Sequence, residues 1–335
     1  MKKCVKKHPQ HTWVKPLAIA GGVALASAAV GYAYVELMTS VVARRRNEAL
    51  SRVVTKCTTP KKKAKPSPNY DYLKDMAEEV KALPTRPVSI QNSEGMTLKA
   101  HYYPAVNPKR LLILVHGWHS EWYKDFCASA PFFHKSDCDL LMIEQRCHGE
   151  SDGKYISYGV KERYDILDWL TWAETHLPRL PVYLCGLSMG ATTVLMAAGL
   201  PIEGRVRGIV ADCGYTSPHD IIQTTLKKTL KGASSPTLFA VEMNCRIKGN
   251  FRMDEYSALD AMAQNTNIPV LFIHGDADDF VPCVMTLENF EACQAPKEIF
   301  IVPGAGHGLA YVVDPEGYKK RVLNFFAKYD TPCKE

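Results

Sequence analysis

One stretch of the sequence, from Pro181 to Gly199, sets the strongest limit on what this chain can fold into. It reads PVYLCGLSMGATTVLMAAG, which is a short apolar run, a Gly-Leu-Ser-Met-Gly turn and a segment typical of a helix. A Gly-x-Ser-x-Gly turn between a strand and a helix holds its serine, here Ser188, at a sharp and strained bend. Glycine at positions 186 and 190 removes side chains that would collide with neighbouring elements. Because such a pentapeptide also occurs by chance, its meaning depends on the rest of the chain.

The sequence around this turn alternates apolar runs with helical segments. After a hairpin predicted over 88–103, the apolar runs are Leu111–Val115, Leu140–Ile143, Val182–Cys185, Val206–Ala211, Pro269–Ile273 and Glu298–Val302. The helical segments are Asp71–Ala82, Tyr123–Phe133, Val160–His176, Met189–Ala198, Val284–Cys293 and Gly317–Tyr329. Continuous apolar runs are typical of strands buried on both faces. The succession therefore predicts an α/β fold with a mostly parallel central sheet and helices on both faces.

The interval from Tyr215 to Asn267 interrupts this rhythm, because it is longer than one connecting helix needs. It predicts a helical cap insertion, at about 215–267, over the carboxyl edge of the sheet. Two additional packing helices are the alternative.

Two later loops provide partners for the serine. A serine hydroxyl needs a base within hydrogen-bond reach and an acid that orients the base. After Ser188 the chain contains HGDADDFVP and then GAGHG, each directly after a predicted strand, so both lie at the sheet edge that carries the serine. We predict His307 as the base and Asp278 as the acid. Asp276 is the second candidate for the acid, because the aspartates crowd together in this loop.

Backbone amides are expected to bind the oxyanion that forms on a carbonyl substrate. One is Met189, directly after the serine, and the other is Trp118, after the strand that ends in LVHGW. The side chains of Trp118, Trp122 and Tyr215 are predicted to bind substrate, although aromatic residues at such positions also suit a core. His116 is expected to bond within its own loop.

The first 69 residues have a different character from the rest. Leu17–Val35 carries no charge, and apolar residues continue to Ala43, with lysine- and arginine-rich sequence on both sides. We predict a basic flank over 1–16, a single transmembrane anchor over 17–43, a basic and proline-containing linker over 44–69 and a folded domain over 70–335. A cleaved signal peptide of a secreted protein and a soluble helix are the alternatives. Basic residues on both sides leave the orientation in the membrane open.

Composition excludes several other classes of protein. The net charge is +6, and no nucleic-acid-binding motif accompanies the basic N-terminal region. The 11 cysteines are scattered without a C-x-x-C pair, which fits neither a disulfide framework nor a zinc site. No metal and no cofactor is expected, and the oligomeric state is left open.

Together the motifs resemble the α/β-hydrolase superfamily, and within it the bacterial serine-aminopeptidase-like or BEM46-like hydrolases. The matching stretches are LVHGW, GLSMG, ADCGYTS, PVLFIHGDADDFVP and VPGAGHG, whereas EQRCHGES replaces the usual D-x-R-G-H-G-x-S. The resemblance implies Ser188, Asp278 and His307 as a catalytic triad, with Trp118 and Met189 as the oxyanion amides. It implies a membrane-anchored serine hydrolase that cleaves small or lipid-derived carboxylic esters through an acyl-enzyme. A peptidase or amidase with the same triad and a non-catalytic tethered binding protein are the alternatives.

Overall fold

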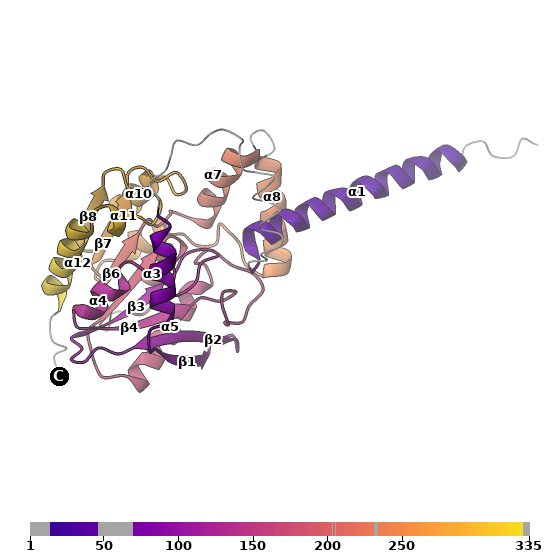
Figure 1. Cartoon of the computed structure of the whole chain (residues 1–335). Coiled ribbons are helices and arrows are strands. Elements are labelled where there is room, and N and C mark those ends of the chain that lie inside the picture. Colours follow the sequence, from indigo (N-terminus) through magenta and orange to yellow (C-terminus); the bar gives the residue numbers. More distant parts are fainter. Residues whose placement is uncertain (1–13, 46–69, 203, 205, 231–233, 331–335) are drawn as a thin grey trace, which may run out of the picture.

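The computed structural model describes residues 14–45, 70–202, 204, 206–230 and 234–330, with side chains from residue 29 onward. An eight-stranded sheet runs through this part of the chain in the order β1-β2-β4-β3-β5-β6-β7-β8 (Figure 1). The strands are β1 Arg86–Gln91, β2 Thr97–Tyr103, β3 Arg110–Val115, β4 Cys138–Glu144, β5 Val182–Leu187, β6 Val206–Asp212, β7 Val270–Gly275 and β8 Lys297–Val302. The pairs β1–β2 and β2–β4 are antiparallel, and the five pairs from β4–β3 to β7–β8 are parallel. The prediction of a mostly parallel sheet is confirmed.

Helices cover both faces of the sheet, also as predicted. They are α3 Tyr72–Lys81, α4 Ala130–Lys135, α5 Glu162–His176, α6 Met189–Ala197, α7 Pro218–Leu230, α8 Ser234–Asn244, α9 Ala258–Gln264, α10 Cys283–Ala292, α11 Ala310–Val313 and α12 Pro315–Tyr329, with a π-helical turn at Cys245–Gly249. Neighbouring residues of a buried strand face opposite cores: Ile113 packs with α5, α6 and α9, whereas Leu112 packs with α3, α4 and α12. Every residue of β3, β4 and β7 is buried, which explains the apolar runs Leu111–Val115, Leu140–Ile143 and Val270–Ile273 within them.

One predicted helix is largely replaced by turns. The segment expected to be helical over 123–133 is helical only from Ala130, at the start of α4. Before it, successive turns are closed by hydrogen bonds from the Lys124 amide to the Glu121 carbonyl and from the Cys127 amide to the Lys124 carbonyl. The Asp125 side chain accepts from the Gly117 amide at 2.6 Å, which ties these turns to the loop after β3. This bond to the preceding loop holds the segment in turns instead of a helix.

The interval 215–267 contains α7, α8 and α9, and these helices do not share one role. Residues of α7 and α8 form a third apolar cluster with Tyr158, Met189 and Tyr215, beyond the carboxyl ends of the strands. In contrast, α9 packs against α6 and contributes Ala258 and Met262 to a core of the sheet.

The remaining helix, α1 Val14–Ala43, projects away from the sheet, and its C-terminal part lies beside α8 (Figure 1). In the described part of the chain, no helix is long and apolar enough to cross a membrane. The transmembrane anchor expected over 17–43 is therefore not supported by the structure, and the side chains of its first part, up to residue 28, lie outside the described residues. Residues 1–13 of the expected basic flank and 46–69 of the expected linker also lie outside them.

Candidate active site

Ser188 lies at the bend between β5 and α6, in a conformation that few side-chain-bearing residues adopt. Its φ is 56° and its ψ is −118°, and its amide donates to the carbonyl of Asp212 at 2.8 Å. The glycines on either side permit this bend. A Cβ on Gly190 would overlap the Val115 carbonyl, and a Cβ on Gly186 would overlap the backbone of Gly190. Close backbone contacts between β3, β5 and α6 therefore require glycine at these two positions of the turn.

The structure brings the three predicted residues of the triad together. His307, in the loop after β8, accepts a hydrogen bond from the Ser188 hydroxyl at its Nε2, with 2.9 Å between the two atoms. Its Nδ1 donates to Oδ2 of Asp278, in the loop after β7, at 2.7 Å. Parallel strands end at the same edge of the sheet, which is why residues more than a hundred positions apart meet here. Such a hydrogen-bonded series can remove the serine proton and hold the imidazole in the tautomer that accepts it.

The surroundings of Asp278 keep it charged. The amides of Phe280 and Val281 donate to its Oδ1 at 2.8 and 2.9 Å, and His274 Nε2 lies 3.1 Å from its Oδ2. Burial by itself would raise the pKa of this carboxyl group, but the hydrogen bonds from His274, His307 and Phe280 outweigh it and hold the pKa well below its usual range.

Asp276, the second candidate for the acid, faces elsewhere. Its Oδ1 accepts from the Gly304 amide at 2.6 Å, and its side chain is exposed. It thereby ties the loop after β7 to the loop after β8. The geometry favours Asp278 as the partner of the histidine.

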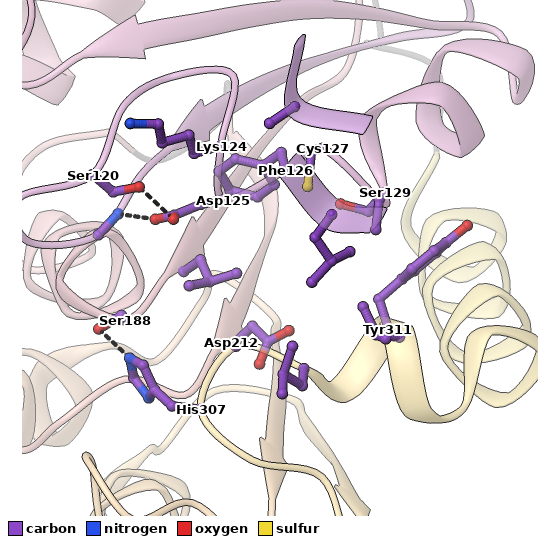
Figure 2. A pocket seen from close by; sticks show the side chains of 18 of the residues that line it. Ser120, Lys124, Asp125, Phe126, Cys127, Ser129, Ser188, Asp212, His307 and Tyr311 are labelled. Carbon is purple, nitrogen blue, oxygen red and sulfur yellow. Dashed lines mark hydrogen bonds between the residues drawn. The ribbon is translucent and has the colours of Figure 1, made fainter. Parts of the chain in front are cut away.

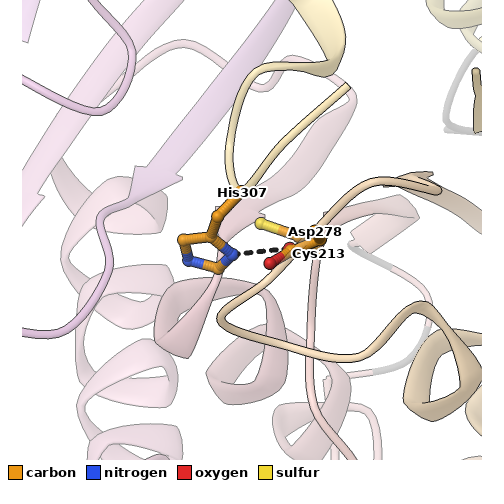
Figure 3. Close-up of side chains that lie close together, drawn as sticks. All are labelled: Cys213, Asp278 and His307. Atoms are coloured by element: carbon orange, nitrogen blue, oxygen red, sulfur yellow. Dashed lines mark hydrogen bonds and ion pairs between the residues drawn. The ribbon is translucent and has the colours of Figure 1, made fainter. Parts of the chain in front are cut away.

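A third group, the thiol of Cys213, lies close to this pair (Figure 3). The ligand atoms of Cys213, Asp278 and His307 lie within 4.8 Å of one another, a spacing that metal sites also show. However, both ring nitrogens of His307 are engaged by Ser188 and Asp278. Burial also raises the pKa of the Cys213 thiol well above its usual value, whereas a metal ligand must be a thiolate. The cluster fits an acid–base pair better than a metal site.

Two amides are placed for an oxyanion beside Ser188. The Gly117 amide is already used by Asp125, so the next amide in the loop after β3, that of Trp118, is the one left for a ligand. Among the described residues, neither the Trp118 nor the Met189 amide has a protein acceptor. Met189 also begins α6, where the helix dipole favours negative charge. His116 bonds within its loop, since its Nδ1 lies 2.8 Å from the Gly117 carbonyl.

A cavity of about 630 Å³ opens at Ser188 and His307 (Figure 2). Its wall comes from α3, the loop after β3, the turn at Ser188 and the segment that follows His307. Wall residues that were not predicted as site residues include Leu73, Ala77, Phe126, Asp212, Phe280 and Tyr311. Among them Asp212 carries a readable signal, because it is a charged residue directly after an apolar run.

Of the three aromatic residues predicted to bind substrate, only Trp118 lines this cavity. Trp122 is buried and stacks on His101 with 3.8 Å between ring centroids. Tyr215 is buried in the cluster beneath α7 and α8, and its hydroxyl donates to the Tyr158 carbonyl at 3.0 Å. A substrate contact by Trp122 or Tyr215 is therefore not supported, because core packing accounts for both side chains.

Comparison with known proteins agrees with this architecture. A family model described as the alpha/beta hydrolase fold matches residues 110–233. The uncharacterized protein YqkD of Bacillus subtilis is 26% identical over 257 residues, which cover 75% of this chain and 82% of that protein. Protein bem46 of Schizosaccharomyces pombe is 24% identical over 202 residues, or 59% of this chain and 61% of that protein. Among solved structures, the Pyrococcus furiosus esterase Pf2001 aligns with a TM-score of 0.60 at 19% identity, over 82% of this chain and 98% of the esterase.

Proposed function

Because the chain belongs to the α/β-hydrolase superfamily and fits its BEM46-like branch, we propose that it is a serine hydrolase that cleaves carboxylic esters through an acyl-enzyme on Ser188. The observation that carries the proposal is the pair of hydrogen bonds through His307. One joins it to the serine hydroxyl at 2.9 Å and the other to Asp278 at 2.7 Å. The esterase Pf2001, which shares the fold, is consistent with this choice.

The proposed reaction proceeds in two halves. In the first, Ser188 Oγ attacks the ester carbonyl while His307 Nε2 takes the hydroxyl proton, and the amides of Trp118 and Met189 bind the oxyanion. The tetrahedral intermediate then expels the alcohol, which receives the proton from His307. In the second half, water gives a proton to His307 and attacks the acyl-enzyme, and the carboxylic acid leaves as Ser188 recovers its proton. Asp278 stays ionised and stabilises the imidazolium in both halves.

The proposal is tested by labelling the full chain with a fluorophosphonate and measuring hydrolysis of 4-nitrophenyl esters. We expect labelling and turnover in the parent protein and neither in Ser188→Ala. The matched control is Ser89→Ala, which alters an exposed serine on β1. Labelling that persists in Ser188→Ala would remove the basis of the proposal. Faster cleavage of aminoacyl amides than of matched esters would instead favour the peptidase alternative, and absence of both labelling and turnover would favour a non-catalytic binding protein.

We also propose that the first part of the predicted anchor, and not its last turns, which pack against the domain, attaches the protein to a membrane. The support is the sequence itself, since Leu17–Val35 is uncharged and a membrane span needs about 20 apolar residues. After membrane fractionation, the full chain should stay in the pellet on alkaline carbonate extraction, whereas a chain without its first 28 residues should not. Release of the full chain by carbonate would contradict an integral anchor.

A further inference from the structure

Asp212 is a buried acid in the wall of the active-site cavity that the proposed reaction does not use. It is the last residue of β6, and its carbonyl accepts from the Ser188 amide at 2.8 Å, so its position is fixed relative to the serine. The residue is only 4% exposed and lines the same cavity as Ser188 and His307. In Figure 2 its carboxyl group lies between His307 and Tyr311.

Its carboxyl group is incompletely satisfied. The Tyr318 hydroxyl donates to it, but Oδ1 has no hydrogen-bond partner among the described residues. Buried polar atoms are nearly always paired, because an unpaired one costs about 1–3 kcal/mol.

Other buried aspartates of the chain show the usual arrangement. Asp139 accepts from the Tyr102 hydroxyl at one oxygen and from the Ala105 amide at the other. Asp165 accepts from Arg146 and Asn92 at its two oxygens. Asp212 differs from these in holding an unpaired and buried acceptor in the wall of a cavity.

Within the described ranges, Asp212 forms no ion pair with a lysine or arginine. The charged or ionisable groups that act on it are His274, His307, Tyr318 and Asp278. Burial dominates and raises the pKa of its carboxyl group to about 7, although His274, His307 and Tyr318 act in the opposite direction. The oxygen can therefore be satisfied by a donor that enters with a ligand, either a neutral hydroxyl or a cationic ammonium group.

We propose that Asp212 forms a polar subsite that binds a hydrogen-bond donor, a hydroxyl or an ammonium group, on the acyl chain of the substrate. This assignment rests on the proposed function, because it concerns the chain attached to the carbonyl that Ser188 attacks. Leu187 pairs with Asp212 across β5 and β6, and adjacent strands lie about 4.8 Å apart, so a donor a few bonds from the carbonyl lies within reach. An acyl-enzyme keeps this chain beside Asp212 through both halves of the reaction.

The test compares three 4-nitrophenyl esters of similar size. They are the esters of 3-hydroxybutanoate, 3-aminobutanoate and 3-methylbutanoate, of which the last has a methyl group in place of the donor. In the parent protein we expect kcat/KM for at least one donor-bearing ester to exceed that for the methyl ester by about tenfold or more, since a site built to bond a polar group discriminates against an analogue that lacks it. The better of the two donor-bearing esters identifies the group.

Two substitutions assign this preference to the carboxyl group. Asp212→Leu should abolish it while the methyl ester is still cleaved. Asp212→Asn, which keeps an acceptor oxygen without the charge, should retain a preference for the hydroxyl ester and lose one for the ammonium ester. Asp254→Asn is the matched control, because Asp254 is an exposed acid that does not line this cavity, and it should leave the preference as in the parent.

The possible outcomes separate the two proposals. If the parent and both Asp212 variants are labelled by fluorophosphonate but show the same ratio of rates for the three esters, the subsite is refuted and the serine hydrolase stands. If the parent is not labelled and cleaves none of the esters, the proposed function fails. A purely structural role of Asp212 would lower all three rates together and leave their ratios unchanged, which also refutes the subsite.

Discussion

Removal of residues 1–45 should impair catalysis, whereas removal of residues 1–28 should not. The difference lies in the C-terminal end of α1, which is bonded to the loop that carries the Trp118 amide. The Trp118 indole donates to the Val42 carbonyl at 3.0 Å, and the Tyr158 hydroxyl donates to the same oxygen at 2.5 Å. The Ile156 amide donates to the Ala43 carbonyl at 2.7 Å.

The His119 side chain adds a further bond, to the Arg44 carbonyl at 2.8 Å. At about 1 kcal/mol each, these four of the hydrogen bonds that truncation removes contribute a loss of about 4 kcal/mol. Loss of the buried Ala43 from the apolar cluster adds to this figure. For a domain of this size we expect the midpoint of thermal unfolding to fall by roughly 5 °C or more.

The effect on rate follows from the loop itself. Loss of one oxyanion donor lowers kcat by about 10²–10³. A looser loop would position the Trp118 amide less well, so part of this decrease is expected. We therefore expect kcat for a 4-nitrophenyl ester to fall at least about tenfold in the chain lacking residues 1–45. The chain lacking residues 1–28 is the matched control, because it keeps every one of these contacts.

Trp118→Phe provides a finer test, since it removes the indole N–H and keeps an aromatic ring. It should lower kcat less than the long truncation does, because the other bonds to α1 remain. Equal kcat and equal unfolding midpoints for the two truncated chains would refute the reasoning and reduce α1 to a passive extension.

The remaining predictions concern the site and its support. Asp278→Asn should lower kcat by about 10⁴, since it favours the wrong imidazole tautomer, whereas Asp276→Asn should cost less than about tenfold, and the reverse order in steady-state kinetics would move the acid to 276. His307→Ala should lower kcat by several orders of magnitude with an unfolding midpoint near that of the parent in thermal scans. Gly190→Ala should prevent stable folding, seen as loss of the cooperative unfolding transition, because its Cβ would overlap the Val115 carbonyl. Burial raises the pKa of Asp212 to about 7, so its carboxyl group destabilises the folded state increasingly as the pH rises from about 4 to about 7. Asp212→Asn should therefore be more stable than the parent at about pH 8, by up to about 4 kcal/mol in urea unfolding. At about pH 4 the two proteins should unfold with similar free energies.

The sequence predicted the sheet and the meeting of Ser188, Asp278 and His307 because the signals for both are local. Continuous apolar runs mark buried parallel strands, and the end of each run marks the edge where ligands bind. The glycines of the turn reveal close backbone contacts even though their partners lie far away in the chain. Fold and candidate triad could thus be derived without knowledge of any long-range contact.

Other features depend on contacts that the local pattern does not encode. The segment 123–133 has a helical pattern, but the bond between Asp125 and the Gly117 amide holds part of it in turns. Aromatic residues near the motifs suit a pocket or a core equally well, and packing placed Trp122 and Tyr215 in the core. The unpaired Oδ1 of Asp212 can be recognised only when the hydrogen-bond partners of the buried acids are known.

The position of α1 changes how the N-terminal region should be understood. From the sequence, the folded domain was predicted to start at residue 70, after a basic flank, an anchor and a linker. In the structure, Ala43 shares an apolar cluster with Met189, the residue directly after the nucleophile of the proposed reaction, and with Leu238 of α8. Glu36 further pairs with Lys248 in the π-helical turn after α8. A flexible tether would leave the orientation of the active site free, whereas a helix bonded both to α8 and to the loop after β3 fixes it. The last turns of α1 are therefore a part of the site's framework, and any substitution that detaches them should affect turnover before it affects the core of the sheet.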